Sequence, residues 1–486
     1  MLEDRAKFTM IIAIFLKGMI MLRIGKDFPG VQQEVTERQA LPDSNVIHTA
    51  TLSNGVRVAM QALPGEPITN IRVQIKAGSR HETEGQFPRG VVHYREHMGF
   101  KGVRDIQGEI FDAAKVVSAF GGNLNASTGF SRTCYSANVP AEGNAEAITA
   151  ISAMVCRPVV DIDDTDRERL RIRSECMEDG LDPDSRLSDN LFLTAFDNHP
   201  AMHPILGTEE TILSIQPSDI ERFQRENYTG ANTVIAITGD IDPVATLEQL
   251  KEQFTLPSGQ KINDVAPPYI GGLSTVAERV RGTRIKLAFH YDGKDQDLRC
   301  TNVMLADLLT EDDNSLLYKE MCVKLGIYSV FCSNYASDNL LIISFKTFPE
   351  TLGACLESLR DTLKGLRESV DPDLLAEKIL ASKSYEKSAM RSPERDANAM
   401  ATALLHDGVV PAKDDFYHKY QAVTQERIKA AVEKLLQSPP TLVASGDVST
   451  VPSYDKLCEM FALDKTPAAP ALSCASVSTA NVPQQG

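Results

Sequence analysis

The feature that most constrains the fold of this 486-residue chain is an internal repeat. A helix-like stretch, an apolar strand and a Gly-Asp pair occur in this order twice, at 218–241 and at 424–448. Apolar positions in the two stretches are offset by 207 residues, as are Gly239 and Gly446. Self-similarity at a fixed long period is the mark of a duplicated structural unit. The chain is therefore expected to contain two copies of one domain.

A second pair of segments supports the duplication and indicates the class of fold. Residues 121–155 and 326–359 each run from glycine through a strand and a proline to a helix, with offsets of 205 to 209. The alternation of Ile71, Val73 and Ile75 is typical of a strand with one covered face, which favours antiparallel sheets. We predict an α+β fold of two homologous domains, each a mostly antiparallel sheet covered by helices.

The expected domain limits follow from shifts in composition. They are an N-terminal extension that would hold any targeting segment (1–44), a first domain (45–255), a Pro- and Gly-rich linker (256–274), a second domain (275–464) and a disordered tail (465–486). The extension contains an apolar run that is too short and interrupted to span a bilayer. Acidic residues precede that run, and they match neither a signal peptide nor a mitochondrial presequence.

Charge and cysteine content narrow the class of function. The formal net charge is −16, which excludes a typical nucleic-acid binder and suits a basic partner or substrate, although solubility alone would also explain it. The nine cysteines form no Cys-x-x-Cys motif and are odd in number, so a disulfide framework is not expected. This usage favours a reducing compartment.

A metal-binding pattern lies in the first half. In the run His93-Tyr94-Arg95-Glu96-His97, the two histidines are four residues apart and share one face of a helix. Both imidazoles can bind one metal ion, with Glu96 beside them as a base for water. Two histidines, one carboxylate and an open position suit zinc. The alternative is an exposed, charged helix with two unrelated histidines.

A third ligand is sought on a second helix. Residues 166–179 read as a highly charged helix, on which Glu168 and Glu175 are two turns apart and face the same way. The alternative for this helix is an ordinary salt-bridged surface.

Several segments together resemble the M16 metallopeptidases, whose motif is an inverted His-x-x-Glu-His. They are 52–58 (LSNGVRV), 77–82 (AGSRHE), 93–102 (HYREHMGFKG), 122–126 (GNLNA) and 203–209 (HPILGTE). The resemblance runs over most of the chain.

The resemblance implies roles for individual residues. His93, His97 and Glu175, which lies 78 residues after His97, would bind zinc. Glu96 would be the catalytic base, and Glu168 would support the site from behind the ligands. It also implies that Asn125 and Ala126 lie on a strand edge that holds the substrate backbone by strand addition.

The number of domains indicates a subgroup of the family. A two-domain chain with one motif resembles half of a clamshell, as in the metal-binding β subunit of mitochondrial processing peptidase and the related core subunits of complex III. The resemblance implies a heterodimer with a second M16-like subunit, in the mitochondrial matrix or on the matrix side of the inner membrane. Asp189 would receive the arginine of a basic presequence, and Tyr328 of the second half would contact substrate. Ser127 and Cys322 depart from the family pattern, which has Tyr and Arg there.

Three functions remain open at this point. The first is a zinc endopeptidase that removes targeting presequences. The second is a structural core subunit of complex III with little or no peptidase activity. The third is a peptidase of bacterial type that degrades peptides.

Overall fold

The computed structural model describes residues 46–197, 199–263, 266–291, 296–335, 338–389, 392–410 and 415–462. The predicted extension, the tail and Cys474 lie outside these residues. No helix in the described part is both long and apolar enough to span a membrane.

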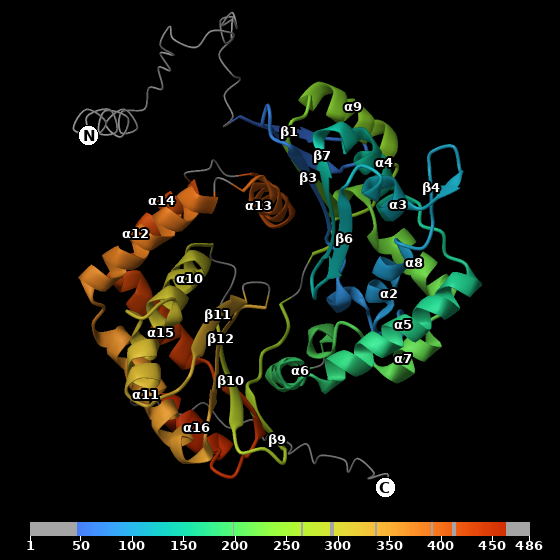
Figure 1. Cartoon of the computed structure of the whole chain (residues 1–486). Helices are drawn as coiled ribbons and strands as arrows, with labels where there is room; N and C mark the ends of the chain where they lie inside the picture. The colour runs from blue at the N-terminus through green and yellow to red at the C-terminus, as the bar shows by residue number, and fades with distance from the viewer. Residues whose placement is uncertain are drawn as a thin grey trace, which may run out of the picture. The chain divides into compact units, whose positions relative to one another are not determined.

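The first half is built on a six-stranded sheet in the order β1-β2-β8-β3-β7-β6 (Figure 1). Its strands are β1 (Ile47–Thr51), β2 (Arg57–Ala62), β3 (Ile68–Ile75), β6 (Asn123–Thr128), β7 (Thr133–Pro140) and β8 (Thr233–Gly239). All pairs are antiparallel except the parallel pair β2 and β8. A small hairpin, β4 (Val103–Arg104) and β5 (Ile110–Phe111), lies outside this sheet.

The helices of the first half pack with the sheet around one hydrophobic core, except α6, whose apolar residues belong to another cluster. They are α2 (Val91–Met98), α3 (Ala113–Ser118), α4 (Asn144–Cys156), α5 (Ile162–Leu181), α6 (Pro183–Ala195), α7 (Glu209–Ser214), α8 (Pro217–Asn227) and α9 (Pro243–Gln253). Short 3-10 turns are η1 (Ser79–His81), η2 (Ala141–Gly143), η3 (Pro200–Met202) and η4 (Gly230–Asn232). Asp161 and Asp182 accept hydrogen bonds from the first turns of α5 and α6, which fixes where these helices begin.

The second half repeats the design with a five-stranded sheet in the order β11-β12-β10-β13-β9. Its strands are β9 (Gly272–Ala277), β10 (Thr283–His290), β11 (Val330–Tyr335), β12 (Leu340–Thr347) and β13 (Thr441–Gly446). Its helices are α10 (Gln296–Thr310), the π-helix η5 (Tyr318–Val323), α11 (Pro349–Glu368), α12 (Pro372–Ala389), α13 (Pro393–His406), α14 (Asp415–Gln421), α15 (Gln425–Gln437) and α16 (Tyr454–Phe461). Apart from α13, they enclose a core of their own.

Five strands of the first sheet match the second sheet in order, and β1 has no counterpart there, so the predicted duplication and fold class are confirmed. The order β6-β7-β3-β8-β2 of the first half corresponds to β11-β12-β10-β13-β9 of the second, and each contains one parallel pair at the equivalent place. One detail of the predicted boundaries differs, because β9 begins at Gly272, inside the expected linker. A strand starts there because its residues pair in parallel with β13.

One helix of each half packs on the sheet of the other half. Helix α6 packs on β9, β10 and β13 of the second sheet through a cluster around Leu187, Leu191 and Phe192. Helix α13 packs on β2, β3 and β8 of the first sheet through Met400, Leu404 and their neighbours. Because each helix covers a sheet that is distant in sequence, the two halves share buried surface.

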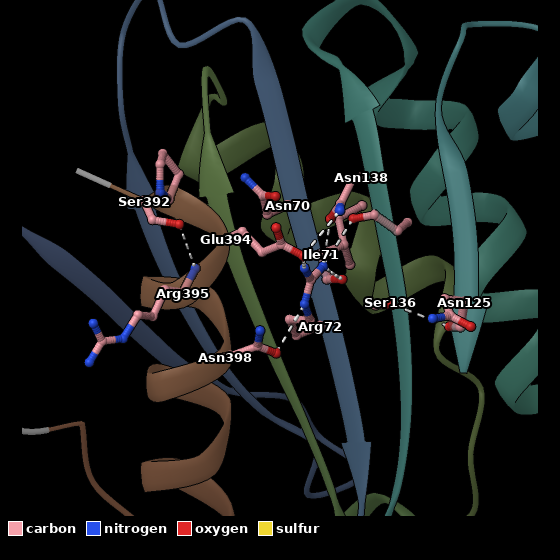
Figure 2. Close-up of polar contacts among 12 residues, drawn as sticks. Asn70, Ile71, Arg72, Asn125, Ser136, Asn138, Ser392, Glu394, Arg395 and Asn398 are labelled. Atoms are coloured by element: carbon pink, nitrogen blue, oxygen red, sulfur yellow. Dashed lines mark hydrogen bonds and ion pairs between the residues drawn. The ribbon is translucent and has the colours of Figure 1, made fainter. Parts of the chain in front are cut away.

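A buried arginine on β3 adds polar contacts to the α13 interface (Figure 2). The guanidinium of Arg72 donates to Asn398 (3.0 Å) and Glu394 (2.5 Å) of α13, and to Asn138 of β7 (2.8 Å). The contacts of this one side chain therefore tie α13 to two strands of the first sheet.

Candidate metal centre

Helix α2 is held by a carboxylate at its N-terminus. Glu82 is buried and accepts hydrogen bonds from the backbone N–H groups of Gly90 and Val92, both 2.9 Å long. These are groups that the helix itself leaves without partners. Burial raises the pKa of Glu82 to about 8, and the two backbone donors oppose that rise. Gly90 has φ +86°, a left-handed conformation that favours glycine at this entry to the helix.

The predicted ligands meet at one point. Both histidines of α2 turn Nε2 toward Glu175 of α5: His93 Nε2 is 3.7 Å from Oε1, and His97 Nε2 is 3.4 Å from Oε2. One donor atom from each residue lies within 4.8 Å of the others. Among the described residues this is the one such group of three metal-ligand side chains. The predicted i, i+4 pair and two-turn carboxylate therefore converge as ligands would.

The donor set fits zinc chemically. Burial, and then the neighbouring His97, lower the pKa of His93 to about 3, so its imidazole is neutral and can donate a lone pair. The Nδ1 atom of His93 is buried and finds no hydrogen-bond partner among the described residues. Two imidazoles and one half-exposed carboxylate suit zinc, and they leave a side open to solvent.

Glu168 lies behind the ligands, as predicted. Its Oε2 accepts a hydrogen bond from His97 Nδ1 at 3.0 Å, which leaves Nε2 of the same ring free to face Glu175. Its other oxygen, Oε1, pairs with the ammonium of Lys101. Burial alone would raise the pKa of Glu168, but these two partners together hold it below its usual value. Glu168 therefore contacts a ligand and takes no direct place in the ligand group.

The predicted base, Glu96, is buried on the same helix face. Burial raises its pKa, and a hydrogen bond from the hydroxyl of Thr128 to Oε2, 2.5 Å long, opposes that rise. Thr128 is the last residue of β6, so the strand predicted to hold substrate also contacts the base.

Arg95 is a charged residue inside the motif, and the structure explains how it is accommodated. It is fully buried on the side of α2 away from the ligands. Its guanidinium lies 4.6 Å from the centre of the Tyr228 ring and donates to the carbonyls of Met154 and Val155. This side chain is therefore part of the core and does not disturb the metal centre.

The predicted substrate residues fall in different surroundings. Asn125 and Ala126 lie on β6, which is an edge strand as expected. Asp189 is on α6, where burial and the nearby Asp179 raise its pKa to about 6, while Lys286 opposes the rise. Tyr328 lies between η5 and β11, is 96% exposed, and makes no hydrogen bond or ring contact in the described part of the chain. Of the predicted substrate residues, those on β6 therefore lie on a strand that contacts the metal centre. Tyr328 contacts no other side chain of the described residues through a hydrogen bond or its ring.

Comparison with known proteins identifies the fold and the family. The model of the insulinase family, peptidase family M16, matches residues 57–209, and that of the peptidase M16 inactive domain matches residues 214–381. The chain belongs to the M16 peptidase family. The first match contains the whole ligand group, and the second covers much of the second half, whose described residues hold no such group.

Relatives and solved structures agree with this assignment. An uncharacterized zinc protease of Streptomyces coelicolor is 24% identical over 82% of this chain and 89% of its own length. A protease from Helicobacter pylori has the same fold, with a TM-score of 0.73, 20% identity, and coverage of 83% of this chain and all of that one. A chain of complex III from Candida albicans also matches, with a TM-score of 0.72, 16% identity, and coverage of 86% and 100%. The predicted M16 membership is confirmed.

Sequence reasoning missed three residues that support the centre: Glu82, Lys101 and Thr128. Glu82 and Lys101 belong to segments that resemble the family, but a sequence pattern does not say what a side chain contacts. Thr128 ends the strand that carries Asn125 and Ala126, and its contact with Glu96 spans 32 residues.

Proposed function

We propose that this chain is a zinc-dependent endopeptidase that cleaves peptides bound as an added strand along β6. The observation that carries the proposal is the convergence of His93, His97 and Glu175 beside Glu96, next to the open edge of the sheet. A metal-binding role alone would not need a buried carboxylate on the ligand helix or a strand edge beside it.

The residues divide the chemistry among them. A bound zinc ion would polarise water and the peptide carbonyl. Glu96 takes the proton of the attacking water and can return it to the leaving amine. The Thr128 hydroxyl holds the Glu96 carboxylate in place. The outer backbone edge of β6, which includes Asn125 and Ala126, would align an extended substrate. The Ala126 N–H there donates to Asn125 Oδ1 at 2.9 Å, a contact that a substrate strand would replace.

Glu96→Gln tests this function. Because an amide takes up no proton from water, we expect cleavage of an unstructured peptide to fall at least about 100-fold while zinc content stays at the wild-type level. Glu178→Gln, an exposed position on α5, is the matched control and should leave the rate unchanged. Wild-type cleavage by Glu96→Gln would exclude Glu96 as the base, and a wild-type chain that binds no zinc would exclude the function.

For substrates, we propose basic presequence peptides. The net charge of −16 and the carboxylates of Asp179 and Asp189 support this choice. Nearby Asp184 is not free for this purpose, because Lys346 (2.8 Å) and Arg284 (3.7 Å) of the second half pair with it. If Asp189 receives arginine, Asp189→Asn should lower kcat/KM for an arginine-bearing peptide and spare its alanine counterpart. Equal losses for both peptides would contradict this specificity.

A second candidate function is a core subunit of complex III, which the fold similarity to a chain of that complex favours. The metal ligands argue for the peptidase, because a structural subunit does not need them. We further propose a second M16-like subunit as partner and a mitochondrial location. Purification from the native source in mild detergent separates the candidates. A heterodimer with an M16-like chain supports the peptidase, and cytochromes b and c1 in the preparation support the core subunit.

A further inference from the structure

One charged residue near the metal centre has no role in the mechanism above. Lys101 lies just beyond the end of α2, is about one quarter exposed, and pairs with Oε1 of Glu168. The other oxygen of the same carboxylate accepts the hydrogen bond from His97 Nδ1. Lys101, Glu168 and His97 thus form a chain of contacts from the surface to the metal ligand, which we call the charge triad.

The second half contains the same three positions. Helices α5 and α12 begin 210 residues apart, and Glu168 and Lys378 are each the seventh residue of their helix. With the same offset, His97 corresponds to Asp307 and Lys101 to Glu311. The alignment also pairs core residues of α2 with core residues of α10, such as Met98 with Leu308. Helix α10 contacts β11, α12 and α15, as α2 contacts the equivalent β6, α5 and α8.

The acid or base type of each position is exchanged in the second copy. The base–acid–base order of His97, Glu168 and Lys101 becomes the acid–base–acid order of Asp307, Lys378 and Glu311. These three side chains line one cavity of about 290 Å³, and Lys378 is fully buried, as Glu168 is nearly so. His93 has only Val303 in its place, so no ligand pair remains in the second copy.

The reversal separates two explanations for Lys101. If Lys101 were an incidental surface lysine, its counterpart would have no reason to carry a charge opposite to the buried central residue. The outer position instead carries the charge opposite to the central residue in both halves, with a metal centre and without one. A side chain as buried as Glu168 or Lys378 needs a partner of opposite charge, because an isolated charge in a protein interior is costly. Lys101 is that partner for Glu168, and in the second copy Asp312, the residue after Glu311, pairs with Lys378 at 2.6 Å.

We propose that Lys101 is a positioning residue of the metal centre, which holds the Glu168 carboxylate against His97 and so raises metal affinity. Both carboxylate oxygens of Glu168 have a partner. Oε1 pairs with Lys101, and Oε2 accepts the hydrogen bond from His97. Without Lys101, Oε1 has lost its partner, the carboxylate can rotate, and the His97 ring is no longer aligned with Glu175. Partners behind metal ligands typically change affinity about 10- to 100-fold.

The test measures zinc affinity of the full chain by competition with a chromophoric chelator, using Lys101→Met and Lys101→Arg. We expect the Met variant to bind zinc at least about 10-fold more weakly and the Arg variant to remain within about threefold of wild type. Lys115→Met, on exposed α3, is the matched control and should change nothing. Simple Coulomb repulsion between Lys101 and zinc predicts the opposite sign, since loss of a nearby cation would tighten binding.

Two further readouts keep the outcome unambiguous. The absorption spectrum of the cobalt-substituted chain should change in the Met variant and be restored by Arg, because it reports ligand geometry. Thermal unfolding of the metal-free forms identifies a variant that fails to fold, in which case Lys101→Gln takes its place. Unchanged or tighter zinc binding by a folded Met or Gln variant overturns the inference. The inference rests on the proposed function, but absence of zinc binding by the wild type would contradict that function instead.

Discussion

Arg72→Met should measurably loosen the contact of α13 with the first sheet. Arg72 is buried on β3, and its guanidinium donates to Glu394 and Asn398 of α13 and to Asn138 of β7 (Figure 2). A hydrogen bond to a charged group contributes about 1.5–3 kcal/mol, and breaking a fully buried ion pair costs about 3–5 kcal/mol. The Glu394 side chain is 55% exposed, so water can replace part of what it loses. Methionine also keeps much of the apolar packing. We therefore expect a loss of about 3 kcal/mol in the free energy of unfolding.

The assay is urea denaturation, combined with hydrogen exchange that resolves α13 from α11. Amides of α13 should exchange faster in the variant, and those of α11 should not. A double-mutant cycle with Glu394→Gln should give a coupling of only about 1 kcal/mol, because that carboxylate is exposed. Arg360→Met, which removes a surface pair with Asp361, is the control and should cost less than about 0.5 kcal/mol. A loss below about 1 kcal/mol for Arg72→Met, or unchanged exchange in α13, would refute the reasoning.

Three further predictions concern the centre and its counterpart. Thr128→Val should lower kcat about 10- to 100-fold without changing zinc content, because Glu96 loses its hydrogen bond. Thr128→Ser keeps a hydroxyl and should restore the rate. Equal rates in the wild type and both variants would contradict this prediction. Asp307→Asn should stabilise the chain at pH 8 by on the order of 3 kcal/mol and hardly at pH 4. Burial and Glu311 raise the pKa of Asp307 to about 7, so the wild type loses stability as pH rises from about 4 to 7. The measurement is the free energy of unfolding in urea at several pH values. The same pH dependence in the wild type and in Asp307→Asn would exclude this prediction. Gly90→Ala should destabilise the chain more than Gly85→Ala. Both glycines have positive φ, but only at Gly90 would the added Cβ lie 2.5 Å from a backbone oxygen, that of Leu206. Equal unfolding midpoints of the two variants would contradict this prediction.

Much of the fold could be predicted because it is encoded locally. The apolar strand 234–238 lies within β8, and the helix-like stretch 424–436 differs from α15 by one residue at each end. Proline or a capping aspartate at the start of a helix fixes its first turn through neighbouring residues alone. Repetition of these local signals at a fixed offset then predicts two matching domains.

The exchange of α6 and α13 could not be predicted from the same signals. The apolar stripe of α13 indicates that one face is buried, but not which sheet covers it. That sheet includes β2 and β8, about 160 to 340 residues earlier in the chain. Only the packing of the two halves decides this, because an apolar face has no preference for one apolar surface over another of similar shape.

The metal centre divides in the same way. The sequence by itself placed His93 and His97 on one helix face and Glu168 and Glu175 on one face of another by their spacing, and the family resemblance implied that Glu175 is the ligand and Glu168 its support. The tertiary structure brings the two helices together, so that Glu175 faces both histidines and Glu168 contacts His97 from behind. It also supplied Lys101 to Glu168 and Thr128 to Glu96. The physical reason is that helical spacing fixes directions within one segment, whereas contacts between segments depend on how the sheet and helices pack.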